Sequence, residues 1–346
     1  MSQQNIPSAA ERARLRRKLI KKVEAIHQIY GEYELLEEIS GLVDDLRRRD
    51  HRSSQGSGML LIGPSGAGKT TFVEHYFSRF KRKLKAIVLE NGDSADRVPV
   101  VLVKVRNSTL KYFTEATYQA LVGIEPPPEN QYRMTDLIIE KAVDMQVQLF
   151  IFDESHQAIQ GRDESVVNNF SIFFKDLLNA KRFAILIVGT RDARRYLTVN
   201  EELDGRIPIK RELGAFAWDN MIQRGYFLAF LKQFDEHFVP ILGGLSGLAE
   251  PDMAVRIHAG SGALLRGISM LLEQAGKYAV DDLLAGCEGR ITIQHLARAY
   301  EDRQRDKGGP NPFLVENPVP YMPVLESEEE PPKSTRRSNK DHRFRP

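Results

Sequence analysis

Residues 63–71 read Gly-Pro-Ser-Gly-Ala-Gly-Lys-Thr-Thr and bring three glycines together with one lysine and two threonine hydroxyls. The stretch fits the pattern G-x-x-x-x-G-K-[ST], whose glycines let consecutive backbone N–H groups point into one concavity that suits a phosphate. It follows an apolar run and precedes a predicted helix, whose N-terminal dipole also favours an anion. The sequence therefore predicts a phosphate-binding loop for ATP, formed by Gly63, Pro64, Ser65, Gly66, Ala67, Gly68, Lys69, Thr70 and Thr71.

Two carboxylates follow a second apolar run. Residues 148–154 read QLFIFDE, which places Asp153 and Glu154 at the end of a predicted buried strand. Ligands of open α/β sheets bind at that end of the strands. We expect Lys69 to reach the β- and γ-phosphates of ATP. Thr70 and Asp153 would hold Mg²⁺, and Glu154 would polarise the water that attacks the γ-phosphate.

Three further positions would complete a site for phosphoryl transfer. Thr190 ends the predicted strand 183–190 and resembles the sensor-1 position of an AAA+ ATPase. Arg266, near the start of a helix in GSGALLRGISMLL, resembles sensor 2. Arg206, or Arg211 behind it, follows the sensor-1 strand at about the interval of an arginine finger. Such a finger acts on the nucleotide of a neighbouring subunit, so this pattern predicts an oligomer.

The elements that would position these residues alternate between strand and helix up to about residue 214. Alternation of this kind predicts an α/β fold, a parallel sheet with flanking helices. Beyond it the strand signal fades and helical patterns follow. We predict a basic N-terminal helical extension (1–30), an AAA+ nucleotide-binding domain (31–214), a small all-helical lid domain (215–306) and an extended or disordered tail (307–346).

Composition sets limits on the remaining possibilities. The chain has 346 residues, a formal net charge of +2, 42% hydrophobic residues and a single cysteine. One cysteine forms no intrachain disulfide, which fits a reducing cytoplasm. No apolar run approaches the ~18 residues of a membrane-spanning helix, so no membrane partner is expected. The charge is unevenly spread, because residues 12–22 are strongly basic and residues 326–330 acidic.

Four segments together resemble the TnsC/TniB family of AAA+ ATPases that regulate DNA transposition. They are the phosphate-binding loop, LFIFDESHQ, AILIVGTRDARRYL and GSGALLRGISMLLEQA, within a resemblance that covers about residues 30–305. The resemblance implies a bacterial, cytoplasmic ATPase that oligomerises as a ring or filament on double-stranded target DNA. It also implies that the protein links a target-selection protein (TniQ- or TnsD-like) to a DDE transposase (TnsB- or TniA-like).

The resemblance also suggests where DNA would bind. Lys104, Arg106, Thr109 and Lys111 lie between a predicted strand and its helix, where members of the family grip the DNA backbone. Lysine, arginine and hydroxyl side chains suit phosphate contacts and read no base sequence. A solvated loop remains the alternative for this segment, and the basic N-terminal helix is a second candidate.

Other functions stay open at this point. The tetrad 153–156, DESH, matches a helicase box, but the required second RecA-like domain has no counterpart in the helical remainder of the chain. His156 is then expected to pack or cap after the strand. A helicase loader of the IstB or DnaC type, and a nucleotide-regulated signalling module of the AAA+/STAND type without DNA binding, are the remaining alternatives.

Overall fold

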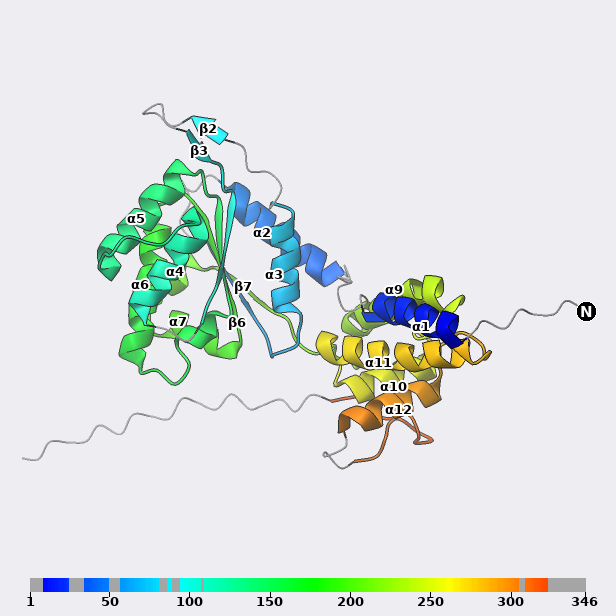
Figure 1. Cartoon of the computed structure of the whole chain (residues 1–346). Coiled ribbons are helices and arrows are strands. Elements are labelled where there is room, and N and C mark those ends of the chain that lie inside the picture. The colour runs from blue at the N-terminus through cyan, green and yellow to red at the C-terminus, as the bar shows by residue number, and fades with distance from the viewer. Residues whose placement is uncertain are drawn as a thin grey trace, which may run out of the picture.

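The computed structural model describes residues 9–24, 34–49, 57–80, 86–88, 94–106, 109–304 and 309–322. Figure 1 shows two parts side by side, an α/β half built on a sheet and a helical half. None of the helices in these ranges is long and apolar enough to cross a membrane.

Five parallel strands form the centre of the α/β half. The last residues of neighbouring strands pair with each other, Lys104 with Asp153 and Ile62 with Gly189. The carboxyl ends of these strands therefore meet at one edge of the sheet. The predicted parallel sheet with flanking helices is therefore confirmed. In spatial order the strands are β4 (Val100–Lys104), β5 (Leu149–Asp153), β6 (Ala184–Gly189), β1 (Gly58–Ile62) and β7 (Ile209–Glu212).

Helices cover both faces of the sheet because successive strand residues point to opposite sides. Leu149 and Ile151 of β5 belong to one core, and Phe150 and Phe152 belong to the other. One core is closed by α2 (Glu34–Arg48) and α3 (Lys69–Ser78), and the other by α4 (Leu110–Val122), α5 (Gln131–Asp144), α6 (Glu164–Asn179), α7 (Arg195–Thr198) and α8 (Glu201–Arg206).

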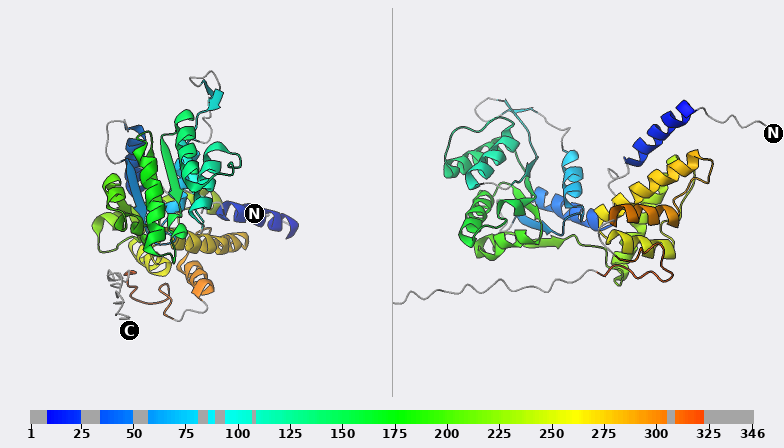
Figure 2. Two further views of the ribbon diagram at one scale, coloured as in Figure 1. Left: turned by 90° about the vertical axis from the view of Figure 1, so that its left-hand side faces the viewer. Right: turned by 60° about the horizontal axis from the view of Figure 1, so that its bottom comes forward.

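The helical half shares a core with the α2–α3 side of the sheet, because buried residues of both belong to one continuous cluster. The N-terminal helix α1 (Ala9–Glu24) packs against two helices of this half, α11 (Leu265–Leu284) and α9 (Met221–Leu242). It lies at the edge of this half (Figure 2). The remaining helices are α10 (Pro251–Ser261) and α12 (Ile293–Gln304).

Residues 309–322 form an arm of turns and irregular backbone that packs on the helical half. Phe313 is only 2% exposed and lies over Gly260, where a Cβ atom would come within 2.6 Å of the ring. Arg256 donates to the carbonyl oxygens of Pro312 at 3.0 Å and Val315 at 2.8 Å. Residues 305–308 and 323–346 lie outside the described residues, so the expectation for them stays a prediction.

Several elements differ from the sequence-based expectation. β7 and the hairpin of β2 (Ala86–Val88) with β3 (Ser94–Asp96) were not predicted. β7 exists because residues 209–212 pair with 59–62 of β1, a contact that the local sequence IKRE does not encode. The helix predicted after the phosphate-binding loop is α3, which begins at Lys69 and ends at Ser78.

Candidate nucleotide-binding site

The phosphate-binding loop connects β1 to α3, and glycine is needed at Gly66 and Gly68 for two reasons. Gly66 and Gly68 have φ angles of 87° and 92°, a left-handed conformation that other residues rarely adopt. A Cβ atom on Gly68 would also lie 2.5 Å from Leu265 Cδ1, and one on Gly66 would lie 3.1 Å from Arg266 Cβ. The two glycines therefore shape the loop and let the first turn of α11 approach it.

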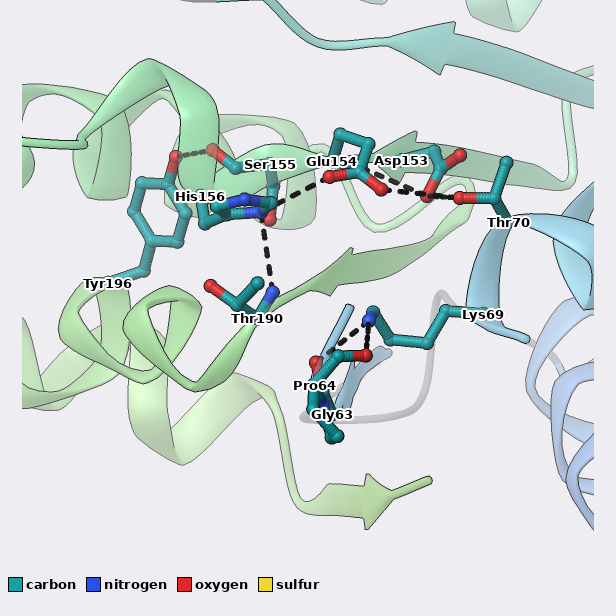
Figure 3. Close-up of polar contacts among 10 residues, drawn as sticks. All are labelled: Gly63, Pro64, Lys69, Thr70, Asp153, Glu154, Ser155, His156, Thr190 and Tyr196. Carbon is teal, nitrogen blue, oxygen red and sulfur yellow. Dashed lines mark hydrogen bonds and ion pairs between the residues drawn. The ribbon is translucent and has the colours of Figure 1, made fainter. Parts of the chain in front are cut away.

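Lys69 is held inside this loop. Its side chain is nearly buried, and Nζ donates to Gly63 O at 2.7 Å and Pro64 O at 2.9 Å (Figure 3). Burial lowers the pKa of Lys69, while the nearby carboxylates of Glu154 and Asp153 act to raise it. The structure thus places a cation in the concavity where the sequence predicts phosphate.

The structure brings Thr70 together with both carboxylates at the end of β5. Thr70 Oγ1 lies 3.4 Å from Asp153 Oδ1 and 3.3 Å from Glu154 Oε1. Asp153 is 1% exposed, and burial raises its pKa, whereas the hydrogen bond from Thr70 acts to lower it. A buried carboxylate beside a hydroxyl, next to a half-exposed second carboxylate, is compatible with the roles predicted for Asp153 as a Mg²⁺ ligand and Glu154 as the residue that polarises water.

His156 lies between Glu154 and Thr190. The backbone N–H of Thr190 donates to His156 Nδ1 at 3.3 Å, and the same Nδ1 lies 3.6 Å from Glu154 Oε2 (Figure 3). Burial lowers the pKa of His156, and a ring nitrogen that accepts an N–H belongs to neutral histidine. His156 was expected to pack or cap after the strand, and it also lines the cleft.

Besides its backbone N–H, Thr190 places its side-chain hydroxyl in the wall of the site. Its Oγ1 is buried and has no hydrogen-bond partner among the residues that the structure describes. Buried hydroxyls in proteins are normally satisfied, so this atom has a free bonding capacity inside the cleft wall. A phosphate oxygen or a water beside it would use that capacity, as the predicted sensor-1 role requires.

The turn after β5 is held from behind by Tyr196, a residue that the sequence did not single out. Glu154 has a φ of 57°, which is uncommon for a residue other than glycine. The next carbonyl, Ser155 O, accepts a hydrogen bond from Tyr196 Oη at 2.7 Å, and Tyr196 O accepts one from Ser171 Oγ at 2.8 Å. This buried chain of bonds fixes the backbone that carries Glu154.

A cleft of about 480 Å³ opens between the two halves of the molecule, and Lys69, Thr70, Glu154, His156 and Thr190 line it. The helical half contributes Phe230, Leu265 and Met270 to its walls, and α2 contributes Leu36. Arg266 also lines the cleft, and its backbone N–H donates to Gly66 O at 3.0 Å. The apolar residues had no distinct signal in the sequence, because their pattern is that of any helix packed on a core.

The two candidate finger arginines lie outside this cleft. Arg206 donates to Glu202 O at 2.9 Å at the end of α8, and Arg211 NH2 lies 3.5 Å from Glu38 Oε1. Neither contributes to the cleft of its own chain. A residue that acts on a neighbour's nucleotide has to lie outside its own site, so this placement is compatible with the predicted role.

The candidate DNA-binding residues lie at the same edge of the sheet as the cleft. Lys104 ends β4 and pairs with Glu74, while Lys111 lies 3.8 Å from Glu115. Thr109 caps α4 by accepting a hydrogen bond from Tyr112 N at 3.3 Å, and Arg106 is exposed. Lys104, Thr109 and Lys111 therefore each have a partner within the chain, and Arg106 is open to solvent.

The sheet, the phosphate-binding loop, the carboxylates after β5 and the helical half that closes the cleft define an AAA+ ATPase. The fold is shared with Cdc6p from Pyrobaculum aerophilum at a TM-score of 0.52 and 16% identity, over 79% of this chain and 68% of that one. It is shared with the Aeropyrum pernix ORC2 protein in its ADPNP–ADP complexes at 0.53 and 14%, over 81% and 71%. Drosophila ORC bound to DNA gives 0.52 and 10%, over 88% and 69%.

The family of the chain follows from its sequence. The model of the family described as bacterial TniB protein matches residues 6–211, and the chain belongs to this family. No curated protein is significantly similar to it in sequence. The predicted membership in the TnsC/TniB family and the predicted ATPase activity are thereby confirmed.

Proposed function

We propose that this ATPase regulates DNA transposition by assembling on target DNA in its ATP-bound form. The observation that supports this most is that, in this member of the TniB family, residues of both halves line a single cleft. Lys69 and Thr190 offer bonds to phosphate from the α/β half, and Arg266 enters from the helical half. Binding of ATP would therefore fix the position of one half relative to the other.

The residues of the cleft fit Mg²⁺. Thr70 Oγ1 and Asp153 Oδ1 are hard oxygen donors that lie together, and Mg²⁺ in such sites takes one or two protein ligands plus phosphate oxygens. Mg²⁺ supplies charge neutralisation to the phosphates when bound. Glu154 lies beside this pair and would accept the proton of the attacking water.

Hydrolysis in the proposed assembly depends on a neighbour. Arg206 is the first candidate for the finger and Arg211 the second, since both lie outside the cleft of their own chain and remain partly exposed. An arginine that reaches the γ-phosphate from the adjacent subunit stabilises the charge of the transition state. Nucleotide, subunit contact and hydrolysis are then coupled in a ring or a filament.

DNA is the proposed template of the assembly. Lys104, Arg106, Thr109 and Lys111 would contact the phosphate backbone without reading sequence. Lys104 pairs with the exposed Glu74 and Lys111 with the half-buried Glu115 at 3.8 Å, and such surface ion pairs are weak enough to exchange for phosphate. The similarity to ORC, solved in a complex with DNA, is consistent with this use of the fold.

The proposal extends to partners and to the division of the chain. A DDE transposase of the TnsB or TniA type and a target selector of the TniQ or TnsD type would bind the assembly in the bacterial cytoplasm. We assign residues 31–214 to the nucleotide-binding domain, 215–306 to the lid, 1–30 to an N-terminal extension and 307–346 to the tail. The extension would move with the lid, because α1 packs on α11.

The test is a fluorescence-anisotropy titration of duplex DNA at two salt concentrations, with and without a non-hydrolysable ATP analogue. Binding should be weak without nucleotide, strong with the analogue, independent of sequence and steeply reduced by salt. Lys104→Ala with Lys111→Ala should weaken binding equally on all sequences and leave nucleotide affinity unchanged. Tight binding without nucleotide, or a double variant that binds as the wild type does, would contradict the coupling or this choice of residues.

A further inference from the structure

The N-terminal helix α1 is attached to the helical half by one side only. Val23 is fully buried, and Leu19 and Ile20 pack against the core beside it. A Cβ atom on Gly276 of α11 would lie 3.3 Å from Val23 Cγ1, so the absence of a side chain there lets the helix approach. The helix is thus docked through a short apolar stripe.

Two ion pairs fix the same side of α1 to α11. Arg16 Nε lies 2.5 Å from Asp281 Oδ1, with a second bond from its NH2 to Oδ2 at 3.0 Å. Lys277 Nζ lies 3.3 Å from Glu24 Oε1 near the other end of the contact. The docking therefore sets both the position of α1 and its rotation about its own axis.

This rotation turns five cations away from the protein, and we call them the α1 basic face. With about 100° of rotation per residue they fall within an arc of about 140° opposite Val23. All five side chains are exposed, and none forms an ion pair or a hydrogen bond within the described part of the chain. One acid, Glu11, lies on the same side at the start of the helix and has a partner of its own. The face consists of Arg14, Arg17, Lys18, Lys21 and Lys22.

We propose that the α1 basic face binds the phosphate backbone of double-stranded DNA as a second contact surface, separate from the loop after β4. This proposal rests on the proposed function, because it assumes that the ATPase acts on DNA. The five cations span about 12 Å of helix at a rise of about 1.5 Å per residue. Duplex DNA carries one charge per about 1.7 Å of its axis, so the face has a charge density that approaches that of the duplex.

The way α1 is docked favours DNA over a membrane surface. A helix that binds a bilayer inserts its apolar side between the lipids. In α1 that side is occupied, since Leu19, Ile20 and Val23 pack on the helical half. Leu15, 41% exposed, is the one large apolar side chain that the described part of α1 leaves at the surface, which is too little to anchor a helix in a bilayer. What remains for a partner is mainly charge, and bare arginine and lysine side chains suit phosphates.

The face is also connected to the nucleotide cleft through α11. This helix begins at the phosphate-binding loop, where Arg266 N donates to Gly66 O, and it holds α1 near its other end through Lys277 and Asp281. One rigid element therefore joins the phosphate-binding loop to the basic face. A shift of α11 on nucleotide binding would move all five cations together.

The experiment changes the five residues of the face to glutamine, which keeps the helix propensity and removes the charge. A matched control changes five exposed cations elsewhere, Arg133, Lys181, Arg182, Lys232 and Arg290, to glutamine, so both variants lose the same total charge. A third variant exchanges lysine and arginine within the face. Each protein is titrated with a mixed-sequence duplex and ATP analogue at several salt concentrations, after circular dichroism and DNA-free ATP hydrolysis have been matched to the wild type.

The α1 variant should bind at least about ten-fold more weakly, and the slope of log K against log salt should fall by about 0.9 for each DNA phosphate that is no longer neutralised. The control and the exchange variant should stay within about two-fold of the wild type. An α1 variant with the affinity and slope of the wild type would overturn this proposal and leave the DNA-binding function intact. A wild type that binds no DNA would instead overturn the proposed function, and the basic face with it. Loss of binding to polyglutamate at an unchanged DNA slope would assign the face to an acidic protein and overturn the proposal too.

Discussion

The α/β half and the helical half contribute different kinds of group to the same cleft. From the α/β half come side chains that are buried and hydrogen-bonded within the chain, such as Lys69 and Asp153. The helical half contributes an exposed arginine, Arg266, and apolar side chains such as Phe230 and Met270. We therefore predict that the groups at the edge of the sheet hold the phosphates and Mg²⁺, and that the groups of the helical half respond to the nucleotide.

The largest effect on ATP hydrolysis is expected from Arg206, which belongs to the α/β half and lies outside the cleft of its own subunit. Arg206→Ala should keep ATP binding and lose hydrolysis by about 10³-fold or more, because an arginine finger stabilises the transition state of the neighbour's reaction. The turnover of the assembled protein measures this. Mixing Arg206→Ala with Glu154→Gln should restore part of the activity, since some interfaces then combine an intact finger with an intact glutamate. Absence of rescue in assemblies of normal size would show that Arg206 does not act across the interface.

A smaller effect is expected from the helical half. Arg266→Gln should reduce ATP turnover by about ten- to a hundred-fold, which corresponds to the removal of one hydrogen bond between charged groups. The change should also weaken discrimination between ATP and ADP, because the arginine would contact only the γ-phosphate. Arg290→Gln, an exposed arginine elsewhere in the same half, is the control and should leave both unchanged. If Arg266→Gln keeps normal turnover and normal discrimination between ATP and ADP, Arg266 takes no part in the reaction, which would contradict its predicted role.

The smallest effect concerns how the helical half holds the C-terminal arm. His258 Nε2 donates to Phe216 O at 2.7 Å, Nδ1 accepts from Tyr321 N at 3.1 Å, and burial lowers its pKa. Because the folded pKa lies below the unfolded one of about 6.5, the unfolded chain takes up the proton first as the pH falls. Stability from this residue is complete above about pH 6.5 and declines below it, by at most about 1.4 kcal/mol per pH unit.

The check is the melting temperature of the wild type and of His258→Gln between about pH 7.5 and 5. Other buried groups also make the stability depend on pH. Burial raises the pKa of Asp153, so its contribution to stability changes with pH in the opposite direction. The difference between the two proteins isolates His258. Wild type should lose stability faster than the variant below about pH 6.5, and parallel curves would contradict the hydrogen-bonding assigned to this ring.

Sequence reasoning located the groups whose chemistry is encoded locally. The phosphate-binding loop, Asp153, Glu154 and Thr190 each follow an apolar strand, so the pattern of the chain also gave their place at the sheet edge. The parallel sheet and the helical second half followed from the same alternation. Family membership added the expected partners, which no single residue indicates.

What the sequence did not reveal depends on contacts between distant segments. β7 is a strand only because it pairs with β1, and Tyr196 fixes the turn at Glu154 from more than forty positions further along the chain. Leu36 and Met270 both line the cleft although they lie far apart in the sequence. The docking of Phe313 over Gly260 is of the same kind, since a proline-rich segment gives no local sign of the surface that receives it.

The most direct test of the account compares two variants in the number of subunits that they assemble on duplex DNA in the presence of ATP. Glu154→Gln should bind ATP and scarcely hydrolyse it, and Lys69→Ala should lose nucleotide binding. Electron microscopy and sedimentation should find Glu154→Gln in rings or filaments around DNA and Lys69→Ala as single subunits. If both variants assemble alike, or if neither assembles on DNA, ATP does not control assembly and the central claim is wrong.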